Sequence, residues 1–239
     1  MQIDVFTIFP ALIENFAKES VLGRAEKRGL LHINCHDLRD GASGNHLNVD
    51  DSPFGGGAGM VLKPEPIFKV VERVNPSRPL FLLSPTGSVF NQAKAVEISK
   101  LKGFSLICGR YEGVDQRVKD HLIDGEISVG DFILSGGEVA ALLIIESVTR
   151  LIPGVMGNNE SSEEESFSDG LLEYPQYTRP WDFRELTPPD ILRSGDHEKI
   201  KEWRKGMSLK LTIEKRPDLI EARGGLTAEE KKLVEKTKK

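Results

Sequence analysis

The residues best suited to chemistry lie in glycine-containing loops in the first half of the chain. The loop CGRYEGVD at 108–115 holds Arg110, Tyr111, Glu112 and Asp115. Two more loops of this kind are LSPTG at 83–87 and SVGDFILSGGE at 128–138. Glycine lets the main chain approach a ligand closely or adopt positive φ. One such loop would be interpreted as a turn, but three in one half of the chain indicate a binding cleft.

An acidic segment and a basic segment follow this cleft. Residues 158–170, NNESSEEESFSDG, carry five acids, no base and one apolar residue, so we expect a flexible lid or linker. The stretch 197–216 has seven bases against three acids, although the net charge of the whole chain is −5. Such a face suits phosphate neutralisation, but charge alone favours a solvated helix face. The combined pattern suits an enzyme that acts on a nucleic-acid base, without naming the reaction.

Other common chemistries lack their motifs. FGGGAGM at 54–60 has no Gly-Lys-Ser/Thr as in a P-loop, and it does not open a helix after a strand as a Rossmann fingerprint does. HINCHD at 32–37 packs two histidines and a cysteine together, but no second cluster has metal-ligand spacing, so we expect no metal site there. The two cysteines, far apart in the sequence, exclude a disulfide framework and indicate a reducing compartment.

Alternating strands and helices are expected to position the loops. Hydrophobic periodicity predicts strands at 2–6, 31–35, 79–83 and 104–108, and helices at 10–28, 64–73, 91–100 and 138–151. Residues 41–60 are expected to form a long loop, and SPTG a turn. The alternation predicts an α/β fold with a parallel sheet, whose ligands lie outside the carboxyl ends of the strands.

Length and composition set the domain organisation. We expect a domain at 1–157, an acidic linker or lid at 158–172 and a small α-helical domain at 173–239, with helices from about 196 to 205 and from about 227 onward. The start, MQIDVFTIFP, does not resemble a signal peptide. The longest apolar run, Val139 to Ile145, is too short for the roughly 20 residues that cross a bilayer. A cytoplasmic protein without membrane association is therefore expected.

The chain contains several motifs whose order and spacing make a chance match to a known family implausible. They are VDDSPFGGGAGM (49–60), LSPTG (83–87), CGRYEGVDQRV (108–118), ISVGDFILSGGE (127–138), SVTRLIPGVMG (147–157), GLLEYPQYTRP (170–180) and SGDHEKIKEWR (194–204). With these motifs the chain resembles the bacterial tRNA (guanine-N1)-methyltransferase family of the knotted SPOUT class. The resemblance runs from residue 8 almost to the C-terminus.

The resemblance implies a parallel sheet whose C-terminal part is tied in a deep trefoil knot, which sequence reasoning alone would not propose because knots are rare. It implies a homodimer with each active site between subunits. The implied reaction is S-adenosyl-L-methionine-dependent N1-methylation of the tRNA guanosine directly 3′ of the anticodon (position 37), which supports reading-frame maintenance. The implied cofactor-binding residues are Leu83, Ser84, Pro85, Gly109, Ile127, Gly130, Ile133, Leu134, Gly136 and Gly137.

The resemblance also assigns catalytic roles. N1 of guanine carries a proton that a base must remove, and a cation must stabilise the negative charge that grows on O6. Arg150 is the implied cation, and Glu112 is expected to position the substrate or a magnesium ion. In the acidic segment the family usually has an aspartate where this chain has Glu165. We expect Glu165 to be the base, with Glu164 and Asp169 as alternatives.

The expected tRNA contacts lie in two places. The loop 49–60 is expected to face the tRNA through Asp50, Gly55 and Gly59. Ser52 stands where the family commonly has a basic residue, which weakens a phosphate contact. In the helical domain, the residues expected to contact the anticodon-stem backbone are Lys199, Lys201, Arg204 and Lys205.

Two alternative functions are compatible with this pattern. A knotted methyltransferase that acts on ribosomal RNA is disfavoured by the long acidic segment and by YPQYTRP at 174–180. A non-catalytic RNA-binding protein that has kept the fold is favoured by Glu165 in place of aspartate. Arg150 and the three cofactor loops argue against it.

Overall fold

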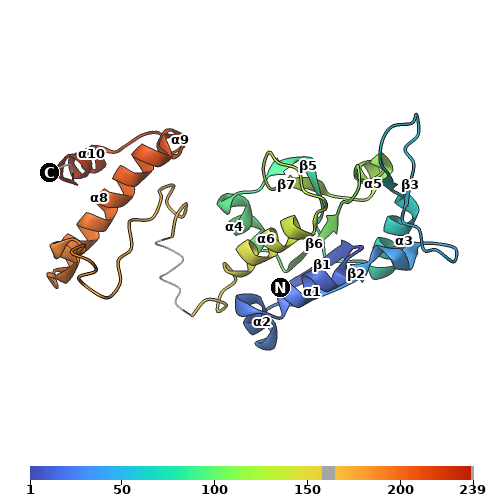
Figure 1. Cartoon of the computed structure of the whole chain (residues 1–239), viewed down its shortest axis with the longest axis horizontal. Coiled ribbons are helices and arrows are strands. Elements are labelled where there is room, and N and C mark those ends of the chain that lie inside the picture. The colour runs from blue at the N-terminus through green and yellow to red at the C-terminus, as the bar shows by residue number, and fades with distance from the viewer. Residues whose placement is uncertain (158–164, 238–239) are drawn as a thin grey trace. The chain divides into compact units, whose positions relative to one another are not determined.

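The computed structural model describes residues 1–157 and 165–237, and the chain divides into two compact units, residues 1–157 and 158–239 (Figure 1). Each unit has a hydrophobic core of its own.

The larger unit is built on a five-stranded sheet in which all neighbouring strands are parallel. The strands are β1 (Gln2–Thr7), β2 (His32–Asp37), β5 (Leu80–Val89), β6 (Gly103–Cys108) and β7 (Gly125–Ser128), in the order β2-β1-β6-β5-β7. Every residue of β6 is buried, as expected for a central parallel strand covered on both faces. The predicted α/β fold with a parallel sheet is confirmed (Figure 1).

Helices cover both faces of this sheet. One core contains side chains of α1 (Pro10–Ala17), α2 (Ser20–Lys27), α4 (Gln92–Ser99) and α6 (Glu138–Thr149). The other contains side chains of α3 (Pro64–Val74), α5 (Gln116–His121) and the 3₁₀ helix η1 (Leu38–Gly41). Strand β6 contributes side chains to both cores, because Phe104 and Leu106 lie in the first core and Ile107 lies in the second.

The segment SPTG is part of β5 rather than the turn expected from its sequence. Leu83 and Ser88 both lie opposite Ile127 of β7, so the four residues between them form a bulge in the strand. Gly87 permits this approach, since a Cβ there would collide with the backbone of Ile127. The prediction of a turn was wrong because Pro and Gly mark bulges as well as turns.

Four other segments differ from the sequence prediction. The helix expected over 10–28 is divided into α1 and α2, with Ser20 at a φ of 50°. The loop expected over 41–60 contains β3 (Asp50–Asp51), which pairs with β4 (Val61–Leu62) as a short hairpin. Helix α5 and strand β7 were not predicted, because segments of six and four residues are too short to show a period.

The smaller unit is irregular over residues 165–189 and mostly helical from Asp190 to Thr237. Its elements are the 3₁₀ helix η2 (Asp190–Arg193), α8 (His197–Lys215), α9 (Pro217–Ala222) and α10 (Ala228–Thr237). Asp196 caps α8 by accepting a hydrogen bond from the Lys199 amide at 3.1 Å. The helix was expected to end near Lys205, but it runs through Gly206 because the face from Gly206 to Thr212 is buried and this packing outweighs a low helix propensity.

Candidate active site

A pocket of about 550 Å³ lies at the carboxyl ends of β6 and β7 and at the bulge of β5. Its walls come from the three loops whose glycines indicated a cleft. All ten residues expected to bind the cofactor line it: Leu83, Ser84, Pro85, Gly109, Ile127, Gly130, Ile133, Leu134, Gly136 and Gly137. Pockets of this size suit ligands of a few tens of atoms.

The third loop gives the pocket an exposed apolar wall. Ile133 is 82% exposed, and the neighbouring Phe132 and Leu134 are also exposed. A cluster of apolar side chains that are exposed to solvent is typical of a binding surface. This wall suits a flat, largely apolar ligand group such as a nucleobase.

Arg110 joins the elements that form the pocket. Its guanidinium forms an ion pair with the buried Glu138 of α6 at 2.9 Å and lies 4.5 Å from the centre of the Phe9 ring. Thr7, at the end of β1, donates a hydrogen bond to the same carboxylate at 2.7 Å. Arg110 also donates to the Ser135 carbonyl at 3.3 Å, which holds the third loop against the second. Sequence reasoning found Arg110 but missed its partners; an acid at the start of the apolar helix α6 was the available signal.

Glu112 and the hairpin loop meet at the pocket. Glu112 lines the pocket, its amide donates to the Met60 carbonyl at 2.9 Å, and a Cβ at Gly59 would collide with its carboxylate. Tyr111 adopts a φ of 59°, a strained value for a residue with a side chain and one often found at ligand sites. The structure thus brings Gly59 and Glu112 together. Asp50 lies in β3 at the base of the same hairpin, and Gly55 has a φ of 85° within its loop.

A polar cluster on the pocket wall was missed by sequence reasoning. Lys119 of α5 forms an ion pair with Glu126 of β7 at 2.8 Å and donates a hydrogen bond to the Thr86 hydroxyl at 3.1 Å. Thr86 in turn donates to Glu126 at 2.6 Å. Burial alone would raise the pKa of Glu126, but the hydrogen bonds from Lys119 and Thr86 hold it below its ordinary value. The members come from separate elements, so no sequence spacing revealed the cluster.

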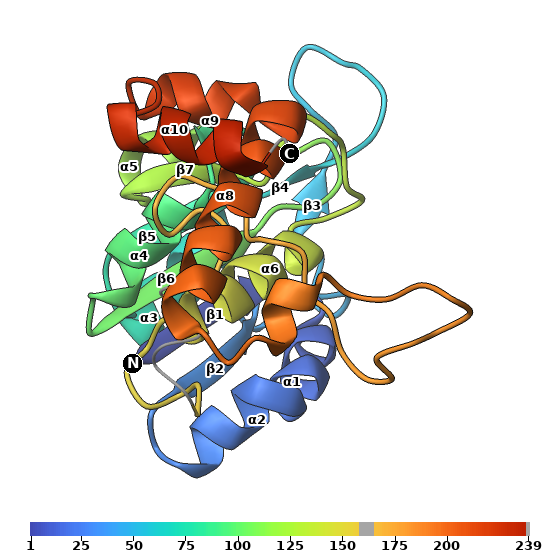
Figure 2. The ribbon, with the colours of Figure 1, turned by 90° about the vertical axis from the view of Figure 1, so that its left-hand side faces the viewer.

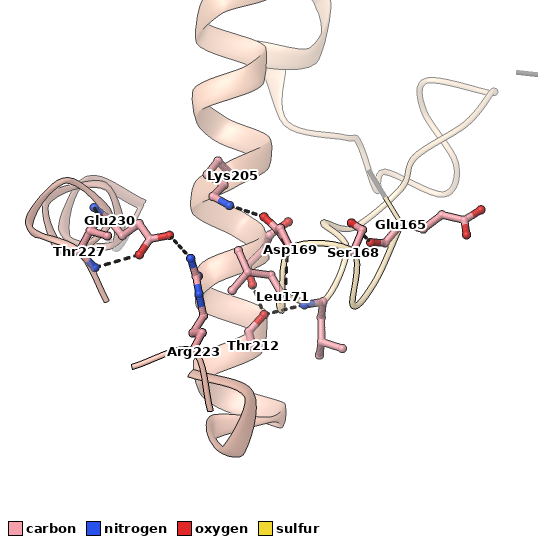
Figure 3. Close-up of polar contacts among 11 residues, drawn as sticks. Glu165, Ser168, Asp169, Leu171, Lys205, Thr212, Arg223, Thr227 and Glu230 are labelled. Carbon is pink, nitrogen blue, oxygen red and sulfur yellow. Dashed lines mark hydrogen bonds and ion pairs between the residues drawn. The ribbon is translucent and has the colours of Figure 1, made fainter. Parts of the chain in front are cut away.

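Arg150 caps the C-terminal end of α6, and its side chain is half-buried. It belongs to the larger unit, whereas Glu165 and Asp169 belong to the smaller one. Glu164 lies outside the described residues. In the smaller unit the Glu165 side chain extends away from α8, whereas Asp169 forms an ion pair with Lys205 (Figure 3).

The four cations expected to contact tRNA do not share one helix face. At about 100° per residue along an α-helix, Lys201, Arg204 and Lys205 fall within one stripe and Lys199 lies on the opposite side. Lys199 forms an ion pair with Asp196 at 2.9 Å. The Arg204 guanidinium lies 4.8 Å from the centre of the Tyr174 ring. The basic stripe is therefore narrower than the sequence indicated.

The cysteines and the HINCHD segment show other chemistry. Burial raises the pKa of Cys35 to about 12 and that of Cys108 well above its ordinary value, so neither thiol is a nucleophile at neutral pH. His36 contacts Asp4 at 2.9 Å and stacks on Phe6. Within residues 1–157 and 165–237, no cluster of three or more His, Cys, Asp or Glu side chains has the arrangement of a metal site.

No helix among the described residues is both long and apolar enough to cross a membrane.

The parallel sheet and its glycine-lined pocket define an α/β protein with a pocket of the kind in which such sheets bind ligands. Residues 1–222 match the model of the family described as tRNA (Guanine-1)-methyltransferase TrmD. The chain therefore belongs to the tRNA (guanine-1)-methyltransferase TrmD family, as its motifs predicted.

Curated relatives named tRNA (guanine-N(1)-)-methyltransferase are similar along nearly their whole length. The protein of Dictyoglomus turgidum is 50% identical over 240 residues, which cover 100% of this chain and 97% of the relative. The proteins of Geobacter sp. (strain M21) and Geobacillus kaustophilus are each 50% identical over 224 residues, which cover 92% of this chain and 90% and 92% of those relatives.

Proposed function

We propose that the chain catalyses S-adenosyl-L-methionine-dependent N1-methylation of the guanosine directly 3′ of the anticodon (position 37) in tRNA, and so supports reading-frame maintenance. The family match over residues 1–222 carries this proposal, because it spans the pocket, Arg150 and the segment that contains Glu165. A ribosomal RNA substrate and a non-catalytic role fit this match less well.

The pocket fits the cofactor that the family implies. Its volume of about 550 Å³ is sufficient, its apolar wall suits the adenine, and its glycines expose the main chain to the ligand. When bound, S-adenosyl-L-methionine supplies an electrophilic methyl group on a sulfonium sulfur. We further propose that the pocket loops form the trefoil knot of the SPOUT class.

Gly137 provides a test of the pocket assignment. Its amide donates to the Gly109 carbonyl at 2.9 Å, and a Cβ at Gly137 would lie 2.8 Å from the Cα of Cys108. Because backbone cannot yield as a side chain does, Gly137→Ala is expected to weaken S-adenosyl-L-methionine binding by about tenfold or more. Titration calorimetry measures this change. Gly157→Ala is the matched control, since a Cβ there meets nothing within 4 Å. If Gly137→Ala and the parent bind S-adenosyl-L-methionine with equal affinity, the cofactor does not bind against this wall of the pocket.

The side chains divide the chemistry between them. Glu165 accepts the N1 proton, which turns a poor nucleophile into a good one. Arg150 places positive charge at O6, where negative charge develops. Glu112 orients the guanine from the pocket edge. It is also the protein ligand we propose for a magnesium ion, since Mg²⁺ is commonly held by one or two carboxylates together with phosphates and water.

A homodimer with composite active sites is part of the proposal. Helices α1 and α6 pack against each other (Figure 1, with a view turned by 90° in Figure 2). They carry exposed apolar side chains, Leu12 and Phe16 on α1 and Val139 and Leu143 on α6. A helix that is apolar on its outer as well as its inner face is typical of a subunit interface. These two helices therefore supply a surface of the kind that a second copy would cover.

The hairpin loop and α8 are the proposed tRNA-binding elements, and a tRNA substrate places the enzyme in the cytoplasm. The loop presents a fully exposed Phe54 beside glycines of positive φ, and α8 carries Lys201 and Arg204. Phosphate neutralisation by such cations gives salt-dependent affinity.

Two tRNA transcripts that differ only at the nucleotide after the anticodon test the function. Methyl transfer from labelled S-adenosyl-L-methionine is expected with guanosine at this position and not with adenosine. Equal labelling of both transcripts would refute the assigned target. Binding of tRNA and cofactor without transfer would favour the non-catalytic alternative.

A further inference from the structure

The segment that carries Glu165 forms a closed turn in the smaller unit. The Phe167 amide donates to the Leu171 carbonyl at 2.7 Å, and the Ser168 hydroxyl donates to the Glu165 carbonyl at 2.7 Å. Phe167 adopts a φ of 76°, a left-handed value that a residue with a side chain keeps only where surrounding contacts fix it. The main chain of Glu165 is thus part of a defined turn.

This turn is attached to α8. Leu171 is buried in the core with Leu209 of α8 and Val234 of α10. The next amide, that of Leu172, donates to the hydroxyl of the fully buried Thr212 of α8 at 2.9 Å. These contacts attach the C-terminal end of the turn to α8. They do not attach the part of the turn that is closer to Glu165.

Asp169 provides that second attachment. One carboxylate oxygen contacts the ammonium of Lys205 at 2.5 Å, and the other accepts a hydrogen bond from the Leu171 amide at 3.2 Å (Figure 3). Burial alone would raise the pKa of Asp169, but Lys205, then the hydrogen bond from the Leu171 amide and then the charge of Arg223 hold this pKa below its ordinary value. Asp169 is therefore a poor proton acceptor at neutral pH and a good ion-pair partner.

Lys205 was expected from the sequence to contact a tRNA phosphate. In the structure its ammonium is directed to Asp169, and the pair remains partly exposed. An exposed ion pair contributes little to the free energy of unfolding. The main effect expected of this pair is to fix the position of Asp169 relative to α8.

We propose that Lys205 is a positioning residue, whose ion pair with Asp169 holds the turn at 165–170, and with it the main chain of Glu165, on helix α8. The proposal rests on Glu165 being the proton acceptor. The turn belongs to the same unit as the other two cations of the basic stripe, Lys201 and Arg204. The tRNA bound by these cations and the group that deprotonates the guanine are therefore fixed to one unit.

Lys205→Met in the full chain tests the proposal. Displacement of a reacting group by about 1 Å can cost up to roughly 100-fold in rate, so we expect the single-turnover rate constant at saturating tRNA to fall about tenfold. The Kd for tRNA and its salt dependence should be unchanged. Lys210→Met, which removes an exposed lysine from the same helix, is the control and should match the parent in both measurements. A phosphate contact would instead weaken tRNA binding and lower the salt slope by about one, with the rate at saturation unchanged. That result would overturn the proposal.

Asp169→Asn supplies an independent second test. It should slow the chemical step as much as Lys205→Met, and the double variant should be no slower than either single one, because one interaction is lost in all three. Lys205→Arg, which keeps the cation, should retain most of the parent rate. Additive losses in the double variant would refute the pairing. If the parent transfers methyl groups and Glu165→Gln does not, while Lys205→Met keeps the parent rate at saturation, this proposal fails and the proposed function stands.

Discussion

Glutamine in place of Glu165 is expected to slow methyl transfer to the tRNA guanine by about 10²- to 10⁴-fold under single-turnover conditions, the range typical of a lost general base. Glutamine keeps the shape of the side chain and cannot accept the N1 proton. The alternative base Asp169 is disfavoured, because its carboxylate forms an ion pair with Lys205 (Figure 3).

Two further variants sharpen this test. Glu165→Asp introduces the residue that the resemblance implies at this position, so it should keep a rate within about tenfold of the parent. That change withdraws the carboxylate by one methylene and leaves the proton acceptor in place. Glu164→Gln tests the alternative base. If Glu165→Gln transfers methyl groups at the parent rate and Glu164→Gln does not, the proton acceptor is Glu164.

Alanine in place of Arg150 is expected to lower the same rate constant by about 10²- to 10³-fold, the usual loss when one group that stabilises a developing oxyanion is removed. Lysine at this position should recover only part of the rate, because it keeps the charge but lacks the planar fork of donors. Binding of S-adenosyl-L-methionine should be unaffected, since Arg150 does not line the pocket.

A structural role for Arg150 gives the opposite pattern. Arg150 caps the C-terminal end of α6, where a cation stabilises a helix by about 0.3–1 kcal/mol through the macrodipole. If this were its whole contribution, Arg150→Ala would lower the unfolding temperature slightly and leave the rate constant at saturating substrates unchanged. Thermal unfolding measured beside the single-turnover assay separates the two roles.

The sequence predicted the features that depend on local pattern. Alternating apolar segments identified four of the five strands of the parallel sheet, and the glycine-containing loops identified the pocket. The fifth strand, β7, has four residues, and its pairing with β5 depends on a bulge at SPTG that looked like a turn. Strand length and glycine content are visible in a sequence, but the register between strands is set by tertiary packing.

The features of the site that the sequence did not predict depend on contacts between elements. Arg110 was recognised as a cleft residue, but its pairing with Glu138 joins residues 28 positions apart and could not be derived from spacing. The same holds for Lys205, whose ion pair with Asp169 joins residues 36 positions apart. A charge pattern indicates how many cations a helix carries, whereas their availability for RNA depends on the acids that the fold brings next to them.

Nucleoside analysis of tRNA treated with the enzyme and S-adenosyl-L-methionine tests N1-methylation most directly. Digestion of the product and separation of its nucleosides should reveal 1-methylguanosine, one per tRNA, and cleavage around the anticodon should place it directly 3′ of the anticodon. A methyl group on another atom of guanine or on another nucleotide would contradict the proposed function. So would the absence of methyl transfer when cofactor and tRNA are both bound.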